Sequence, residues 1–247
     1  MKEKAVFNWS GGKDSALALY KIIQQDEYDI LSLLTSISEQ HQRISMHGVR
    51  VDLLEKQAQS LGIPLVQMQI SETPTMEAYE NMMAITLQDL KNKGATISIF
   101  GDIFLEDLRK YREEKLAELN LKAVFPLWKK PTTEIIKEFI DLGFKTITTC
   151  VNEKYLDKSF VGRIIDKDFL SDLPANVDPC GENGEFHTFV FEGPIFKNPI
   201  RFEKGEIVYR KYISTKADDN SAYNCNSDID SPFDYGFWYC DLLPVKE

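Results

Sequence analysis

The sequence predicts an α/β protein, with a parallel sheet covered by helices on both faces and a smaller mixed α+β domain after it. Two observations lead to this prediction. In the first half of the chain, short apolar runs alternate with segments whose apolar residues recur every three or four positions, which is typical of strand, helix, strand units. Beyond about residue 180, apolar and polar residues alternate singly, as in antiparallel strands.

The expected elements of the first half follow in strict order. A strand at 5–9 leads into a helix at 13–25. The helix at 48–61 is indicated by positions that recur at spacings of three and four, namely Leu53, Leu54, Gln57, Ala58 and Leu61. Gly62 and Pro64 should end it sharply. The other expected elements are strands at 29–37, 64–70 and 96–100, and helices at 75–93 and 105–119.

A further unit follows in the second half, with a strand at 123–128, a helix at 132–143 and a strand at 145–151. Alternating residues then predict strands within 185–196, 200–212 and 233–240, while the polar segment 214–232 is expected to be a loop. The charged triplet Lys204-Gly205-Glu206 predicts a hairpin turn. We place the domain boundary near residue 125, which gives a first, parallel α/β domain at 1–125 and a second, α+β domain at 126–247.

Composition limits the kinds of partner and location. The chain has 247 residues, 43% of them hydrophobic, which is enough for a substantial core. Its formal net charge of -10 disfavours nucleic acid and anionic membrane surfaces as partners. The N-terminus lacks the apolar core of a signal peptide, so a cytoplasmic location is expected. The four cysteines form no CxxC pair, which indicates free thiols instead of a zinc or redox site.

The segment Ser10-Gly11-Gly12-Lys13-Asp14-Ser15 lies where the first strand gives way to a helix. Backbone N–H groups and the positive end of the helix dipole meet there, and glycines let an oxyanion approach without a Cβ in the way. The segment has neither the spacing of a Walker A loop nor that of the GxGxxG dinucleotide fingerprint. A plain turn is the alternative for the Gly-Gly pair alone, and the complete string favours phosphate binding.

The string resembles SGGxDS, the PP-loop of the N-type ATP pyrophosphatases. Three further stretches, GDIFLEDLRKYREEKL at 101–116, FPLW at 125–128 and DPCGENGEFHTFVFEGPIF at 178–196, look like the diphthine–ammonia ligase family and its prokaryotic ATP-binding relatives. The resemblance implies an adenine nucleotide α-hydrolase-like, Rossmann-like fold. It also implies an ATP-dependent amide ligase that adenylates a carboxylate, releases pyrophosphate and then AMP, and transfers ammonia or an amine, with ATP and Mg²⁺ as cofactors.

The resemblance also implies roles for individual residues. Those expected to bind ATP are Ser10, Gly11, Gly12, Lys13, Asp14, Ser15, Gly101 and Asp102. Those expected to be catalytic are Asp14, Ser15, Glu182 and Glu185, with Asp14 also a metal ligand. Those expected to contact the substrate are His47, Arg109, Glu113 and His187. Asp102 departs from the small residue typical of the diphthamide enzymes at its position, which weakens a direct transfer of their substrate.

Several alternatives remain open from the residues themselves. Lys13 either neutralises phosphate or is solvated, and Arg109 with Glu113 has the spacing of an exposed ion pair. His47 either contacts a substrate or is a capping residue. For the whole chain, the alternatives are a nucleotide-binding regulatory module without turnover and a PP-loop RNA-modifying enzyme. The expected partners are ATP, a carboxylate acceptor that is a small molecule or a protein such as a translation factor, and an ammonia or amine donor. Self-association is an open alternative.

Overall fold

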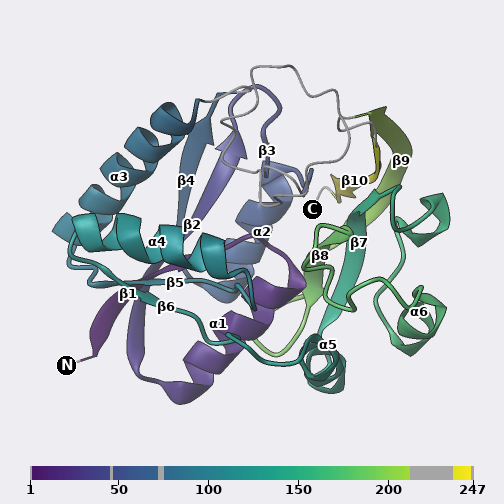
Figure 1. Cartoon of the computed structure of the whole chain (residues 1–247), viewed down its shortest axis with the longest axis horizontal. Helices are drawn as coiled ribbons and strands as arrows, with labels where there is room; N and C mark the ends of the chain where they lie inside the picture. The colour runs from purple at the N-terminus through teal and green to yellow at the C-terminus, as the bar shows by residue number, and fades with distance from the viewer. Residues whose placement is uncertain (1, 45–46, 72–74, 212–235, 246–247) are drawn as a thin grey trace.

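The computed structural model contains two sheets side by side, with helix α1 (Lys13–Gln25) at their junction (Figure 1). It describes residues 2–44, 47–71, 75–211 and 236–245. The expected loop at 214–232 lies outside these residues. Within the described chain, no helix is both long and apolar enough to cross a membrane.

The first sheet is parallel except at one short edge. Its strands are β1 (Glu3–Asn8), β2 (Tyr28–Ser38), β3 (Arg43–Ile44), β4 (Leu65–Ile70), β5 (Ile97–Ile99) and β6 (Lys122–Val124). At Leu33 and Leu34, β2 pairs with β1 and with β4 at once, so these two strands flank it. The parallel strands therefore lie in the order β4, β2, β1, β5, β6, and β3 joins the end of β2 in antiparallel fashion.

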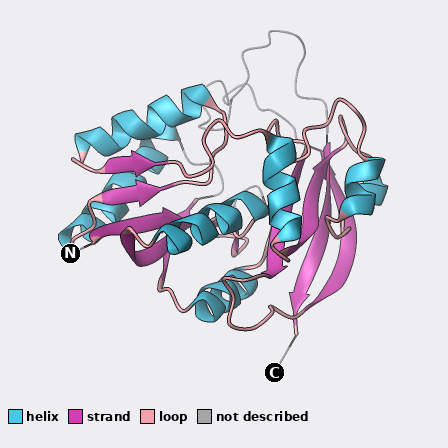
Figure 2. Cartoon of the chain, turned by 90° about the horizontal axis from the view of Figure 1, so that it is seen from below, coloured by secondary structure: helices cyan, strands magenta, loops and turns pink. Residues whose placement is uncertain are grey.

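Helices cover both faces of this sheet, as predicted (Figure 2). Ala5 and Phe7 of β1 face a core shared with α1 and α2 (Val51–Leu61), whereas Val6 faces a second core on the opposite side. This alternation follows from the two-residue period of a strand. Helices α3 (Met76–Asn92) and α4 (Glu106–Glu118) pack against the second core through Leu87, Leu90 and Leu116.

The predicted helices of the first half are confirmed. Helix α1 spans the expected residues, and α2 ends at Gly62, whose φ of 72° is the left-handed conformation that terminates helices. Strand β3 was missed, because a pair of two residues carries no periodicity.

The strand order reverses between β1 and β5. The chain moves from β1 to β2 and β4 on one side, and then returns to β5 and β6 on the other. In open α/β sheets, ligands bind at the carboxyl ends of the strands where the order reverses. Ser10 follows β1 and Gly101 follows β5, so both predicted ATP-binding segments lie at this reversal.

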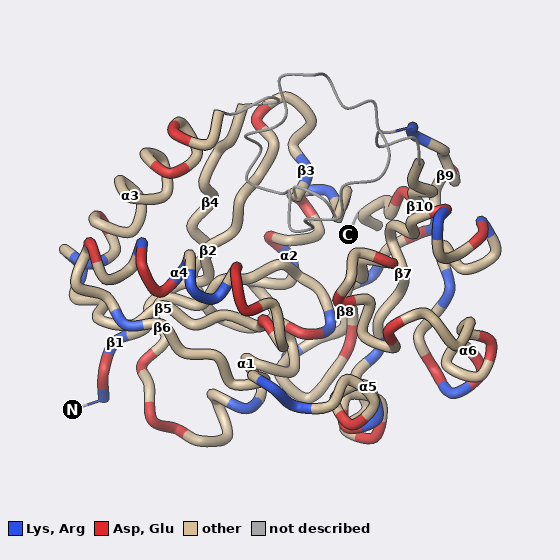
Figure 3. The backbone as a smooth tube through the Cα atoms, in the orientation of Figure 1, with Lys and Arg blue, Asp and Glu red and all other residues tan. Residues whose placement is uncertain are grey.

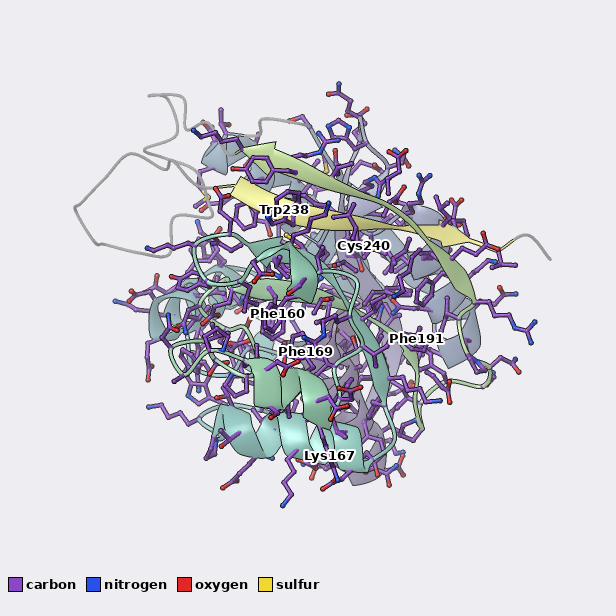
Figure 4. The ribbon with its side chains drawn as sticks, turned by 90° about the vertical axis from the view of Figure 1, so that its right-hand side faces the viewer. Phe160, Lys167, Phe169, Phe191, Trp238 and Cys240 are labelled. Carbon is purple, nitrogen blue, oxygen red and sulfur yellow. The ribbon has the colours of Figure 1, made fainter. Side chains whose placement is uncertain are left out.

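The second sheet is antiparallel, with the order β8, β7, β10, β9. Its strands are β7 (Lys145–Asn152), β8 (Phe186–Glu192), β9 (Phe202–Lys211) and β10 (Gly236–Pro244). Helix α5 (Thr132–Asp141) joins the two sheets, and helix α6 (Lys167–Asp172) with the short 3-10 helix η1 (Lys158–Phe160) covers the outer face. Figure 4 labels Trp238 and Cys240 on β10, with Phe160 and Phe169 below them in the view. The rings of Phe160 and Phe169 meet edge to face.

Two sequence-based expectations for the second half are corrected. Lys204-Gly205-Glu206 forms no turn, because it lies inside β9, where the register shifts opposite Cys240 and Leu242. The triplet is a bulge, for which glycine is as suitable as for a turn. The segment 145–151 is a strand, as predicted, but it begins the antiparallel sheet as β7 and does not extend the parallel one.

The two sheets share one hydrophobic core. Phe7 and Leu33 of the first sheet belong to the same buried cluster as Val151, Phe189 and Cys240 of the second. Because this core is continuous, groups from both sheets are held in fixed positions at the junction, which is where α1 begins.

Candidate active site

Residues 10–15, the glycine loop, connect β1 to α1. Gly12 directly precedes α1 and has an extended backbone conformation. Thr188 and His47 pack closely against it. A Cβ at Gly12 would lie 3.2 Å from the carbonyl oxygen of Thr188 and 3.3 Å from Cε1 of His47. The hydroxyls of Ser10 and Ser15 are 3.1 Å apart, and Ser15 Oγ donates to the carbonyl of Gly12 over 2.9 Å. The loop is therefore preformed, with glycine required by the close approach at position 12.

The second sheet closes the glycine loop from the far side. The Lys13 N–H donates to Thr188 Oγ1 over 3.1 Å, and the Val190 N–H donates to the carbonyl of Gly11 over 2.9 Å. Gln57 of α2, fully buried, donates from Nε2 to the carbonyls of both Gly11 and Val190. Its Oε1 accepts from Trp9 Nε1 over 2.9 Å. Strand β8 and helix α2 thus fix the backbone that would carry the phosphates.

Lys13 is buried, which removes the solvated alternative. Its Nζ lies 2.7 Å from Asp14 Oδ2, donates to the carbonyl of Cys180 and lies 5.5 Å from the centre of the Phe186 ring. Burial is the largest single effect and would lower the pKa of Lys13, but Asp14, Cys180 and Glu182 together outweigh it and the pKa is raised. Lys13 therefore stays charged and connects the glycine loop to the loop at 178–185.

The 178–185 loop, DPCGENGE, precedes β8 and is organised by its own carboxylates. Glu185 is buried and accepts hydrogen bonds from the N–H groups of Asp178 and Asn183, at 3.0 and 2.8 Å. Asp178 accepts from the Cys180 N–H over 2.8 Å and from Thr132 Oγ1 over 2.7 Å. The structure thus directs Glu185 into its own loop, and it leaves Glu182 on the side of Lys13 and Asp14.

Carboxylates gather around this point. Among the described residues, Asp14 Oδ1 is buried without a hydrogen-bond partner, and Asp102 Oδ2 is buried in an ion pair with Arg112. Burial, together with the charges of Asp14, Asp102 and Asp178, raises the pKa of Glu182 to about 8 despite the opposing effect of Lys13. Burial also raises the pKa values of Asp14 and Asp102. Such shifted carboxyl groups are typical of sites that bind cations or transfer protons.

Gly101 and Asp102 approach the glycine loop from β5. A Cβ at Gly101 would lie 3.0 Å from the backbone N of Ser15 and 3.1 Å from the carbonyl carbon of Asp14. Asp102 Oδ2 is 3.2 Å from Nε of Arg112, whose guanidinium lies 4.3 Å from the centre of the Phe100 ring. Both predicted residues are therefore adjacent to the start of α1.

His47 and His187 lie together beside Gly12. Their ring centres are 4.6 Å apart, and His47 Nδ1 is 3.3 Å from the carbonyl oxygen of Thr188. Burial lowers the pKa of His47 to about 4, and burial with the neighbouring His47 lowers that of His187 well below its usual value. Both imidazoles are therefore neutral near pH 7, so each can donate one hydrogen bond and accept another.

Arg109 and Glu113 form the ion pair that their spacing suggested, with Nε and Oε1 2.8 Å apart on α4. The Arg109 guanidinium also lies 4.9 Å from the centre of the Phe125 ring and 4.6 Å from that of Trp128. Charged residues of both signs line α4 (Figure 3). The described contacts of this pair are with α4 and the 125–128 segment, not with the glycine loop.

Three residues that contribute to the site were not singled out from the sequence as site residues: Gln57, Asp178 and Arg112. Gln57 had a local signal, since a polar residue occupied a core-facing position of the helix at 48–61. The others are charged residues in charged stretches, and their partners come from distant parts of the chain.

No group of three or more His, Cys, Asp or Glu residues in the described chain could hold a metal ion by itself. The unpartnered Asp14 Oδ1 nevertheless fits a metal that takes most of its ligands from elsewhere. Mg²⁺ behaves in this way, because it commonly binds one or two carboxylates together with substrate phosphates and water.

The parallel sheet, the reversal between β1 and β5 and the glycine loop placed there define an α/β protein whose ligand site lies at the carboxyl ends of its parallel strands. Comparison with protein-family models makes this more specific. The diphthamide synthase N-terminal domain matches residues 1–123, and the diphthamide synthase C-terminal domain matches residues 131–217. The chain therefore belongs to the diphthamide synthase family.

Two diphthine–ammonia ligases agree with this placement. Human diphthine–ammonia ligase is 25% identical over 225 residues, covering 81% of this chain and 82% of its own. The Schizosaccharomyces pombe diphthine–ammonia ligase is 22% identical over 232 residues, covering 84% of this chain and 38% of its own. A solved structure described as a predicted subunit of tRNA methyltransferase from Methanocaldococcus jannaschii aligns with a TM-score of 0.41 and 16% identity, over 59% of this chain and 80% of that one.

Proposed function

We propose that the protein is an ATP-dependent ligase that adenylates a carboxylate, releases pyrophosphate and then AMP, and forms a C–N bond with ammonia or an amine. The observation that carries the proposal is the junction at Lys13. There, the glycine loop of the first sheet meets the acidic 178–185 loop of the second through a buried lysine. A phosphate site and a cluster of carboxyl groups therefore share one place, as an adenylating ligase requires. Membership in a family with diphthine–ammonia ligases supports this reaction.

The glycine loop would bind the phosphates of ATP. Ser10, Gly11, Gly12 and Ser15 provide backbone and hydroxyl groups at the positive end of α1, which stabilises anions. Lys13 supplies positive charge beside them. Asp14 is the residue that would hold Mg²⁺, which when bound neutralises phosphate charge and promotes departure of pyrophosphate. Gly101 and Asp102 would border the same nucleotide.

The carboxylate of the acceptor attacks the α-phosphate of ATP, so that pyrophosphate leaves and an acyl adenylate forms. His187, which is neutral, would donate its one N–H to an anionic oxygen in this step, while the Nδ1–H of His47 is directed at the carbonyl of Thr188. A neutral imidazole already carries one N–H, so it can stabilise negative charge on this oxygen without changing its protonation state.

The second step needs a neutral amine nucleophile. We propose that Glu182, as a carboxylate, accepts a proton from the ammonium ion or protonated amine, which then attacks the acyl carbon and displaces AMP. A carboxyl group with a pKa of about 8 is closely matched to such a transfer. Glu185 would hold the 178–185 loop in place through its bonds to the loop N–H groups, without touching the substrate. Arg109 and Glu113, on α4, would contact the part of the acceptor that extends away from the reaction.

The test is an analysis of the products of ATP with Mg²⁺, ammonium and chromatographic fractions of a cell extract, comparing wild type with Glu182→Gln. The proposal expects AMP and pyrophosphate in one acceptor-containing fraction, with turnover that requires ammonium or another amine. Glu182→Gln should still bind ATP but lose most of the amide formed. Tight ATP binding without AMP in any fraction would instead indicate a regulatory nucleotide-binding module.

A further inference from the structure

Strand β10 lies outside both regions that match the family models, which end at residue 217. It is nevertheless an inner strand of the second sheet, hydrogen-bonded to β7 on one side and β9 on the other. A strand in this position is integral to the sheet. Its side chains can therefore act as fixed points for neighbouring segments.

Asp241 of β10 binds two arginines of the first sheet's unit. Arg43 Nη1 lies 2.8 Å from Oδ1, and Arg50 contributes Nε at 3.1 Å from Oδ1 and Nη2 at 2.6 Å from Oδ2. The Arg50 contact is a two-pronged pairing of guanidinium and carboxylate, which fixes orientation as well as distance. Arg43 and Arg50 also face each other across an antiparallel bridge, so without Asp241 two like charges would be adjacent.

These contacts hold residues 47–50, which lead into α2. Arg43 Nη1 also donates to the carbonyl of Gly48 over 2.6 Å, and the Ile44 N–H donates to Val49 over 2.8 Å. Gly48 packs directly against β10, since a Cβ there would lie 3.1 Å from Cδ1 of Tyr239. Strand β10 therefore supports this segment at two points, through the charge of Asp241 and the ring of Tyr239.

The residue next to Gly48 is His47, whose ring lies against Gly12 and His187. Strand β10 therefore holds Gly48, and the neighbouring residue His47 contacts the glycine loop. We propose that Asp241 is a positioning residue of the nucleotide site: through Arg43 and Arg50 it fixes residues 47–50, so that His47 stays beside the glycine loop. The expected effect on ATP binding rests on the proposed function, whereas the positioning of His47 does not.

The test compares wild type with Asp241→Asn, which keeps the side chain's shape and removes its charge. The control is Asp172→Asn, which breaks the ion pair of Asp172 with Arg163, 2.7 Å long and on the outer face of the same domain. The first readout is the imidazole NMR signals of the nucleotide-free protein, which are simple because the chain has three histidines. The second is the affinity for ATP with Mg²⁺, measured by titration calorimetry.

In Asp241→Asn, the His47 and His187 signals should shift and broaden while the His41 signal stays in place, and ATP affinity should fall about tenfold. Asp172→Asn should change neither. Unchanged His47 and His187 signals in Asp241→Asn would overturn the proposal. Shifted signals with unchanged affinity would show that Asp241 positions the histidines, and would overturn the claim that this positioning matters for ATP binding. If wild type itself bound no ATP, the proposed function would fail, and the signals would still decide on positioning.

A second variant guards against misfolding of Asp241→Asn. Arg50→Gln removes the two-pronged contact from a side chain that is 39% exposed, and leaves Asp241 bound to Arg43. It should move the same two histidine signals by a smaller amount. An unchanged spectrum in this variant would also count against the proposal.

Discussion

At the scale of single residues, the site depends on positions where a backbone leaves no room for a side chain. Gly101 is the clearest case, because the atoms nearest to a Cβ there belong to the backbone of Asp14 and Ser15. A backbone at 3.0 Å cannot rotate away as a side chain can. Any substitution must therefore push β5 away from the start of α1.

We predict that Gly101→Ala weakens ATP binding by about tenfold or more, because it displaces the first turn of α1, while the overall fold is retained. Titration calorimetry with ATP and Mg²⁺ measures the effect, and circular dichroism checks the fold. The matched control is Gly143→Ala, where no atom lies within 4 Å but φ is +81°. That control should lose some stability and keep its affinity. Equal losses of affinity in both variants would contradict the explanation.

The glycine loop and the Gly101-Asp102 pair were predictable from sequence because each consists of neighbours along the chain. The role of Lys13 was not, since its burial depends on Cys180, 167 residues away. Asp178 and Arg112 were missed for the same reason. Their partners, Thr132 and Asp102, are identified only when α5 and β5 are placed in space.

At the scale of elements, helix α2 connects the two sheets through one side chain. Gln57 bonds to Trp9 and to the carbonyls of Gly11 and Val190, so it joins the residue after β1, the glycine loop and β8. All three partners would lose a hydrogen bond if this amide were replaced by an apolar group. Buried groups left unsatisfied in this way are costly.

We predict that Gln57→Leu lowers the free energy of unfolding by about 2–4 kcal/mol, because the buried Trp9 N–H and two backbone carbonyls each lose a hydrogen bond. It should also weaken ATP binding by loosening Gly11. Urea denaturation and calorimetry measure the two effects. Gln59→Leu, at an exposed position of the same helix, is the control and should change neither by much. A Gln57→Leu protein as stable as wild type would contradict this account of α2.

Element type followed from local periodicity, and element pairing did not. Helices α1 and α2 were predicted within a few residues because each buries a stripe of side chains, and α2 has a clear end at Gly62. The triplet at 204–206 was misassigned because a bulge and a turn both accept glycine among charged residues. Only the pairing of β9 with β10 distinguishes the two, and that partner lies beyond the range of local patterns.

At the scale of the whole molecule, the site concentrates carboxyl groups in a chain that already carries a net charge of -10. Glu182 is the clearest case, with a pKa raised from 4.5 to about 8. Between these two values the folded protein keeps a proton that the unfolded chain has released. Stability must therefore fall as the pH rises through this window.

We predict that wild type and Glu182→Gln have similar melting temperatures near pH 5, and that the variant becomes the more stable by roughly 5 °C near pH 8. Glutamine has no proton to lose, so the penalty of ionising a buried carboxyl group is absent. Differential scanning calorimetry without nucleotide at several pH values measures this. A constant difference between the two proteins across the range would mean that Glu182 does not titrate in this window.

The measurement that tests the central claim most directly is the identity of the bond in ATP that the protein breaks. ATP labelled in its α-phosphate is incubated with Mg²⁺, ammonium and the active extract fraction, using wild type and Asp14→Asn in parallel. The account predicts label in AMP, an equal amount of pyrophosphate, and neither product from Asp14→Asn above background. Label in ADP, with free phosphate as the second product, would contradict the assignment of residues 10–15 as a loop that directs cleavage between the α- and β-phosphates.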